Sequence, residues 1–279
     1  MSNGLAIMTN VASITAQTNM GKTSRMMQSA IGKLSSGLRI QSAADDAAGI
    51  AVSENLRAQN RGYQQALRNA NDGVNIMQTA ESAYQSVSDI LVRMRELAVQ
   101  ASSDGLTDNE RGYLDTEFND LVGEIDRISA VTEYNGIKLL DGTAGTGGTM
   151  TFQVGTRNST DDRIQSTLNS QDATALGVNG SGVDTLANAQ STIDDIDTAL
   201  NDLATDRAEI GATINQLTGA VDHLGTTIEN ISAANSQIRD VDVASESANF
   251  AKSQVLQQAA VAMLAQANAQ PNLALRLLG

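Results

Sequence analysis

The sequence predicts a mainly α-helical fold, an elongated antiparallel helical bundle or coiled coil with a small β-hairpin region. Three observations lead to this prediction. The 279 residues include a single proline, the residue that interrupts helices most strongly. Aromatic residues make up only 3% of the chain, so the bulky side chains that fill a thick globular core are scarce. Long apolar patterns repeat every 3.5 residues, the spacing of helices that face one another along a continuous seam.

The first helix is predicted close to the N-terminus, where two apolar patterns follow one another. The earlier pattern comprises Ile7, Val11 and Ile14. The later one is a heptad in a different phase, with Met20, Ser24, Met27, Ile31, Leu34 and Leu38. Residues 1–21 contain no Asp, Glu, Lys or Arg. A helix exposed to water normally keeps a charged face, so we expect other protein surfaces to cover this segment.

Three further helices are predicted for the middle of the chain, each with its own apolar seam. The seam of the first comprises Ala66, Ala70, Gly73, Met77, Ala80, Tyr84, Val87, Leu91, Met94, Ala98 and Ala101. The chain is expected to reverse near Asp104 and Gly105, where glycine could adopt a left-handed conformation. A Thr107-x-x-Glu110 capping box then begins the second helix, with the seam Leu114, Phe118, Leu121, Ile125 and Ile128. The third helix spans 186–238, where 14 of 16 heptad positions are apolar. Three such seams can close on one another in a bundle.

Residues 136–182 differ from the helical segments, because they contain nine of the 23 glycines. Met150, Phe152 and Val154 alternate with polar residues, and a weaker alternation follows at 164–168. This pattern predicts a short strand pair with a turn at 158–162. The glycine-rich run 142–148 is not followed by Gly-Lys-Ser/Thr, so we interpret it as a loop and not as a phosphate site.

The C-terminal helix is predicted to carry two apolar stripes. One comprises Ala248, Ala251, Val255, Ala259 and Ala262, and the other comprises Leu256, Ala260, Met263 and Ala267. Pairing with the N-terminal helix would cover one stripe and leave the other in water, which favours assembly with further copies over a closed monomer. The candidate self-assembly residues are Ile7, Val11, Ile14, Ile31, Leu34, Leu38, Val255, Leu256, Ala259, Met263 and Leu264.

Composition argues against several classes of function. The net charge is −14, and residues 61–240 hold 27 acidic against 11 basic side chains, which disfavours nucleic acid as a partner. Residues 253–275 also lack charge, but glutamines and asparagines interrupt them, so we expect no membrane insertion. Cysteine is absent, and the one histidine, His223, lies within a heptad. We therefore expect no catalytic residues, no metal site, no cofactor and no enzymatic activity.

Several motifs, in this order along the chain, resemble bacterial flagellin. They cover about 1–142 and 185–279 and comprise 31–40, 42–49, 68–73, 95–100, 124–127, 134–142, 240–242, 254–259 and 264–268. The resemblance implies that segments 1–41 and 241–279 pair as the core of a filament. It also implies that 42–240 form a rod-like helical bundle with a β and loop region at 136–182. Because about 40 residues separate the matched halves, the outer surface domains of longer flagellins are expected to be missing.

The function implied by the resemblance is that of a subunit which polymerises with itself into the flagellar filament used for motility. The implied partners are the flagellar export apparatus and its chaperone, the filament cap and junction proteins, and the innate immune receptor for flagellin. The implied location is the extracellular filament, reached without a cleaved signal peptide. By motif position, the receptor-binding residues would be Arg93, Leu97 and Glu117. Two alternatives are a hook–filament junction protein, which resembles flagellin at both ends, and a coiled-coil adaptor.

Overall fold

The chain divides into two units. The computed structural model describes residues 9–278, with the side chains of residues 9–270. Unit 1 comprises Met1–Ala58 and Asn230–Gly279, and unit 2 comprises Gln59–Glu229. The resemblance to flagellin implies different boundaries, between residues 41 and 42 and between residues 240 and 241. Those boundaries separate roles in the filament, and they stay a prediction.

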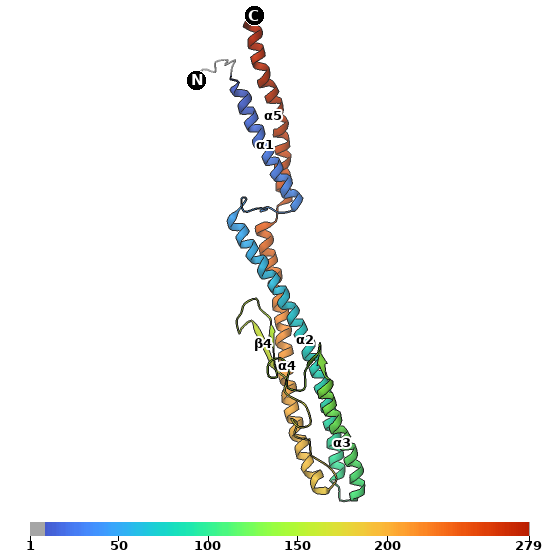
Figure 1. Cartoon of the computed structure of the whole chain (residues 1–279). Coiled ribbons are helices and arrows are strands. Elements are labelled where there is room, and N and C mark those ends of the chain that lie inside the picture. The colour runs from blue at the N-terminus through green and yellow to red at the C-terminus, as the bar shows by residue number, and fades with distance from the viewer. Residues whose placement is uncertain (1–8, 279) are drawn as a thin grey trace. The chain divides into compact units, whose positions relative to one another are not determined.

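Unit 1 is built around two antiparallel helices from opposite ends of the chain. Helix α1 spans Val11–Ser36 and helix α5 spans Val243–Leu278, and the two pack side by side (Figure 1). The side chain of Asn10 caps α1 by accepting a 3.0 Å hydrogen bond from the amide of Ser13. Gly37 ends α1 in the left-handed conformation at φ 72°, and its amide donates to the carbonyl of Lys33.

A short antiparallel bridge joins the end of α1 to the segment between α4 (Leu186–Arg239) and α5. Leu38 pairs with Asp240, and the amide of Arg39 donates a 2.7 Å hydrogen bond to the carbonyl of Arg239. The guanidinium of Arg39 donates at 2.6 Å to the carbonyl of Ile238. This carbonyl lies in the last turn of α4, where it has no partner within the helix, so Arg39 acts as a C-terminal cap.

Unit 2 contains most of α2 (Ala47–Ala101) and α4 (Leu186–Arg239), which run antiparallel, and all of α3 (Asp108–Val131). Every residue of the predicted first seam, 66–101, is buried. The two polar members of the α4 heptad each have a partner on α2. Arg207 forms a 2.7 Å ion pair with Glu81, and in unit 1 Asn235 accepts a 2.8 Å hydrogen bond from the hydroxyl of buried Ser53. These pairs fix the register of the two helices as polar heptad positions do in coiled coils.

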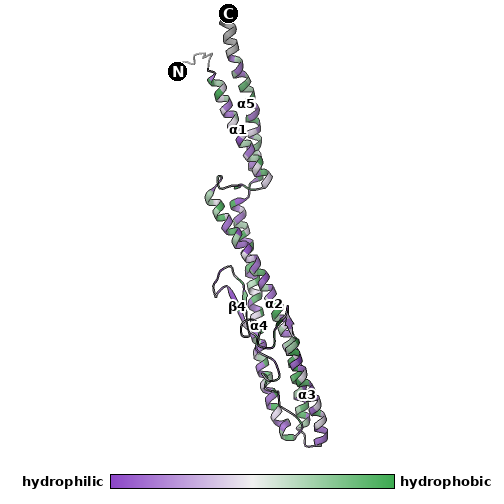
Figure 2. Ribbon diagram, in the orientation of Figure 1, coloured by the Kyte–Doolittle hydropathy of each residue, from purple (hydrophilic) through white to green (hydrophobic). Residues whose placement is uncertain are grey.

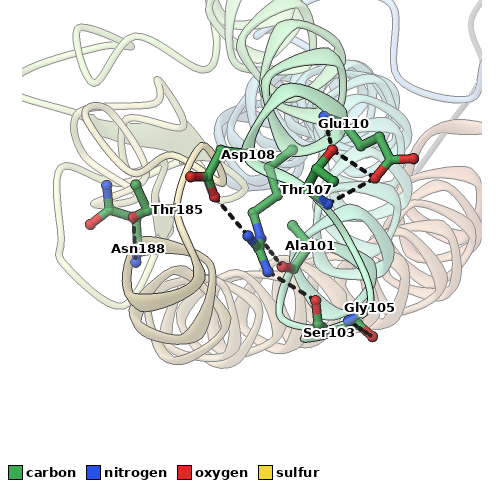
Figure 3. Close-up of polar contacts among 9 residues, drawn as sticks. Ala101, Ser103, Gly105, Thr107, Asp108, Glu110, Thr185 and Asn188 are labelled. Atoms are coloured by element: carbon green, nitrogen blue, oxygen red, sulfur yellow. Dashed lines mark hydrogen bonds and ion pairs between the residues drawn. The ribbon is translucent and has the colours of Figure 1, made fainter.

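The turn between α2 and α3 contains the predicted capping box, which is confirmed (Figure 3). The amide of Glu110 donates to the Thr107 hydroxyl, and the Glu110 carboxylate accepts from the Thr107 amide at 2.8 Å. The reversal near Gly105 is also confirmed, but Gly105 does not adopt positive φ. The guanidinium of Arg111, 6% exposed, instead donates to the carbonyls of Ala101 and Ser103, each at 2.9 Å. The buried guanidinium of Arg111 thus provides hydrogen bonds to the last carbonyls of α2, the role expected for a left-handed glycine.

Two small hairpins connect α3 to α4. The first pairs β1 (Glu133–Tyr134) with β2 (Ile137–Lys138), and the second pairs β3 (Thr149–Gln153) with β4 (Arg163–Thr167). The predicted strand pair and its turn at 158–162 are confirmed. Phe152 is 7% exposed and lies against α2 at Gly73, while the Asn69 amide donates to the carbonyl of Gln153 at 3.2 Å.

The chain after β4 is held against α2 and α4 by a buried polar group. The phenol of Tyr84 donates to the carbonyl of Asn169 at 3.2 Å, and the amide of Gln171 donates to the Asp206 carboxylate at 2.7 Å. Burial raises the pKa of Tyr84 well above its ordinary value, so the phenol keeps its proton.

The close approach of the second hairpin to α2 predicts the effects of two glycine substitutions. A Cβ on Gly73 would lie 2.9 Å from the Phe152 ring and 3.2 Å from Leu217, whereas Gly123 on α3 is exposed with no atom within 4 Å. We expect Gly73→Ala to lower the free energy of unfolding by about 1–3 kcal/mol through overpacking. Gly123→Ala should raise it by about 1 kcal/mol through helix propensity. Urea unfolding followed by circular dichroism measures both, and equal stabilisation by the two variants would contradict this packing.

Candidate self-assembly surface

The seam between α1 and α5, here called the terminal seam, is narrow and partly polar. On α5, the buried and half-buried positions follow one heptad: Glu246, Phe250, Ser253, Gln257, Ala260, Leu264 and Ala267. On α1, the heptad of such positions comprises Ser13, Ala16, Met20, Thr23, Met27, Ala30 and Leu34, and Ser24, Gly32 and Lys33 are half-buried beside it. Small and polar side chains outnumber large apolar ones on both helices. The pairing therefore buries little apolar surface along helices of 26 and 36 residues.

Hydrogen bonds at the two ends of the terminal seam set its register. At the start of α1, the Asn10 amide donates to the carbonyl of Ala267 at 2.7 Å, and the Ser13 hydroxyl donates to Asn268 at 2.8 Å. At the other end, the bridge between Leu38 and Asp240 fixes the same antiparallel alignment. The helices are thus aligned by directed polar contacts as well as by packing.

Most of the candidate self-assembly residues lie outside the terminal seam and face solvent. Six large apolar side chains are 44–66% exposed: Val11, Ile14, Ile31, Val255, Leu256 and Met263. Ala259 is also exposed, Leu34, Leu38 and Leu264 are half-buried, and Ile7 lies outside the described residues. The α5 stripe that runs from Ala248 to Ala262 is exposed throughout. Figure 2 shows hydrophobic residues interleaved with hydrophilic ones along both helices.

Other exposed apolar residues on these helices were not predicted from the sequence. Met26, Val243 and Val261 are 53–60% exposed. They fall outside the heptads, and only the scarcity of charge around 253–275 could have indicated Val261. The heptad on α1 also differs from the expected one, because Ala30 is buried while Ile31 is 48% exposed. The observed contacts keep the 3.5-residue spacing, but they continue the heptad that begins at Ser13, so Ala30 takes the place expected for Ile31.

The candidate receptor residues lie in unit 2 on α2 and α3. The Arg93 guanidinium forms an ion pair with Glu117 at 2.7 Å and with Glu96 at 3.0 Å, and all three side chains are exposed. The hydrogen bond to Glu117, followed by that to Glu96, raises the pKa of Arg93. Leu97, by contrast, is 1% exposed within the core of unit 2. The side chains of Arg93 and Glu117 are therefore accessible to a partner protein, whereas that of Leu97 is not.

The connector between α1 and α2 is organised by a single carboxylate. One oxygen of Asp45 accepts hydrogen bonds from the amides of Gln41 and Ser42, at 3.1 and 3.0 Å, and from the Ser42 hydroxyl at 3.1 Å. The backbone hydrogen bonds from Ser42 and Gln41 hold the pKa of Asp45 below its ordinary value. The ionised form is the one that keeps the turn closed.

The part of the chain that the structure describes contains no candidate metal site and no candidate membrane-spanning helix. Within it, no group of three or more His, Cys, Asp or Glu side chains is placed to hold a metal ion. His223 is exposed on α4. None of the described helices is both long and apolar enough to cross a membrane.

Comparison with known proteins gives the family of the chain. Residues 7–145 match a family model described as the bacterial flagellin N-terminal helical region, and residues 193–278 match the C-terminal helical region. A flagellin of Halalkalibacterium halodurans is 44% identical over 271 residues, which cover 96% of this chain and 98% of that protein. The chain belongs to the bacterial flagellin family.

Further relatives agree with this assignment. A flagellar filament 33 kDa core protein of Treponema phagedenis is 39% identical over 282 residues, covering 96% of this chain and 98% of that protein. A solved structure from Vibrio parahaemolyticus, described as a flagellar hook-associated protein, superposes with a TM-score of 0.58. It is 18% identical and covers 70% of this chain and 100% of that one, so it shows a shared fold. The mainly α-helical fold predicted from the sequence is thereby confirmed.

The role of Asp45 predicts an acid-dependent opening of the connector. Because the folded-state pKa is lowered, the contribution of this carboxylate to stability is present above the unfolded value of about 4 and is lost as the pH falls through the folded pKa. We expect the amide signals of Gln41 and Ser42 in a nuclear magnetic resonance titration to shift together in this acidic range. The control variant Asp45→Asn should show no such step. An Asp45 pKa at or above its ordinary value would contradict the geometry.

Proposed function

We propose that this chain is the structural subunit that polymerises into a bacterial flagellar filament, the helical polymer used for motility. The observation that carries the proposal is the exposed apolar surface of α1 and α5 in the single subunit. Large exposed apolar patches on a soluble chain mark sites of protein–protein contact. Membership of the flagellin family and the filament core proteins among its relatives support the same function.

The arrangement of this surface favours an open polymer over a closed oligomer. The exposed residues of α1 and those of α5 are different patches that surround one terminal seam. When non-identical patches of identical subunits meet head to tail and the rotation does not close, the result is a helical filament. The acidic surface of unit 2, with 26 acidic against 10 basic side chains in 59–229, is suited to the water-facing part of such a filament.

The remaining partners and the location follow from this function. The proposed partners are the export apparatus, a chaperone that covers the apolar ends before assembly, and the filament cap and junction proteins. The proposed location is the extracellular filament, reached through the flagellar export channel without a cleaved signal peptide. We also propose that the chain has no enzymatic activity, since flagellins are structural proteins. The alternative is a hook–filament junction protein. Growth of the purified chain into long filaments would distinguish the filament subunit from this alternative, because a junction protein does not propagate into long filaments.

A substitution on the exposed stripe of α5 tests the proposal. Val255 is 64% exposed in the subunit, so Val255→Gln should leave the fold unchanged while weakening contacts between copies. If Val255 is buried between copies in the filament, its loss is expected to raise the critical concentration for filament growth about tenfold. Val131→Gln, at a residue 52% exposed on α3, is the matched control. Sedimentation of polymer from purified monomer gives both values, and equal effects of the two substitutions would contradict a role for the α5 stripe.

We further propose that the ion pair of Arg93 and Glu117 is the surface presented to the innate immune receptor for flagellin. The support is its exposure, together with the position of these residues in the motif. In this arrangement Leu97 acts through packing, because it is buried in the core of unit 2.

The two roles predict different outcomes for alanine substitutions. Arg93→Ala should weaken binding of the monomer to the receptor ectodomain about tenfold or more, with no change in thermal stability. Leu97→Ala should lower the free energy of unfolding by about 2–5 kcal/mol, because it leaves a cavity in the core. Val99→Ala, at an exposed position on α2, is the control for stability. Unchanged receptor binding by Arg93→Ala would remove the ion pair from the receptor surface.

A further inference from the structure

The basic residues of unit 2 fall into two groups that differ in their partners. The first group contains the six basic residues of 76–148 and 168–209. Each of them forms an ion pair with a carboxylate: Arg93, Arg95, Arg111, Arg127, Lys138 and Arg207. The rest of unit 2 contains four, and none of them forms an ion pair within the unit: Arg61, Arg68, Arg157 and Arg163. We call these four the arginine patch. In a chain with net charge −14, arginines without a carboxylate partner are unexpected.

The fold brings the arginine patch to one region although its members are far apart in sequence. The turn of the β3–β4 hairpin lies against α2, since a Cβ on Gly62 would come within 2.7 Å of Thr156. This contact brings together Arg61, which precedes Gly62, and Arg157, which follows Thr156. Asn69 contacts Gln153, the strand partner of Arg163, which does the same for Arg68. All four side chains are exposed.

The carboxylates near the arginine patch form no ion pair with it, and these include Asp72, one helical turn after Arg68 on α2. Asp162 accepts a 2.6 Å hydrogen bond from the backbone amide of Arg157, and Asp161 bonds to Ser159 within the turn. The guanidinium groups of Arg68 and Arg163 donate only to neutral side chains, those of Gln65, Gln153 and Asn158. The patch thus keeps its positive charge available to a partner.

The complementary surface is the opposite part of unit 2, which we call the acidic end. Residues 76–148 and 168–209 hold 21 acidic against six basic side chains, and all six basic ones are already paired. Within one subunit the far part of the acidic end, around Arg95 and Asp197, lies out of reach of the arginine patch. Arg68 and Arg95 lie on the same helix and are 27 residues apart, about 40 Å along its axis. This separation is several times the Debye length of about 10 Å at 0.1 M salt.

We propose that the arginine patch of one subunit docks on the acidic end of a second copy of this chain in the filament. Head-to-tail assembly brings opposite parts of identical subunits together, so each copy supplies the carboxylates that its neighbour's arginines lack. Guanidinium–carboxylate contacts of this kind select orientation and register between partners. The contact rests on the proposed function, because it requires that the chain polymerises. It adds a specific electrostatic link between the bundles to the apolar contacts of the terminal helices.

Two variants that change the net charge equally test the contact. Arg61→Gln/Arg157→Gln removes two charges from the patch, and Arg127→Glu changes the charge of the acidic end by the same two units. Neither guanidinium in the double variant makes a hydrogen bond within the described residues, so the fold should persist. Seeded growth of the purified full chain from sheared filaments gives the critical concentration of each. We expect the double variant to raise it about tenfold at low salt, with a smaller difference at high salt because of screening.

The control Arg127→Glu should not raise the critical concentration, because it makes the acidic end more negative. Arg61→Lys/Arg157→Lys, which keeps the charge, should grow close to the wild type. Equal rises in the double variant and in Arg127→Glu would indicate only a net-charge effect and overturn the contact. Wild-type growth of the double variant would also overturn it while leaving the proposed function intact. Failure of the wild-type chain itself to form filaments would overturn the proposed function.

Discussion

A helix that packs against one neighbour can bury only one side, and α1 and α5 each have a single long neighbour in the subunit. Their terminal seam is made largely of small and polar residues, with Ser13 and Ser253 buried in it and with Gln257 half-buried. The apolar residues that would make a strong two-helix contact, such as Val255 and Met263, face away from it. Pairing within the subunit therefore leaves most of the apolar surface in water. Contacts with further copies are the way in which these helices become covered, and the function of the chain depends on this constraint.

Unit 2 follows the opposite design, because its apolar seams are satisfied within the subunit. The predicted seam of α2 is buried without exception, and Arg207, the polar member of the α4 heptad in this unit, pairs with Glu81. Its surface is acidic, which favours solubility and keeps subunits apart except where specific contacts overcome the repulsion. The arginine patch provides such a contact. Together the two units combine a nonspecific apolar drive to assemble with charge pairs that select one arrangement.

The sequence predicts the helices well because periodicity reports which side of a helix is buried. The seams of α2, α3 and α4, the Thr107–Glu110 capping box and the β3–β4 hairpin all appear as expected. Polar seams are harder to predict, since Ser253 and Gln257 give no apolar pattern. The same holds for α1, whose seam uses the small Ala30 and leaves the more apolar Ile31 exposed. The end of α2 depends on a buried Arg111, which sequence cannot distinguish from a surface arginine. The arginine patch depends on which strands and helices meet, so only the fold reveals it.

The most direct test of this account is a filament structure at side-chain resolution, obtained by electron cryomicroscopy of polymer grown from the purified chain. The account predicts that Val11, Ile14, Val255 and Met263, exposed in the subunit, are buried against neighbouring copies in the filament. It further predicts that the terminal seam keeps the register set by Asn10 and Ala267. A filament in which these four side chains still face solvent, with contacts made by unit 2 alone, would contradict it.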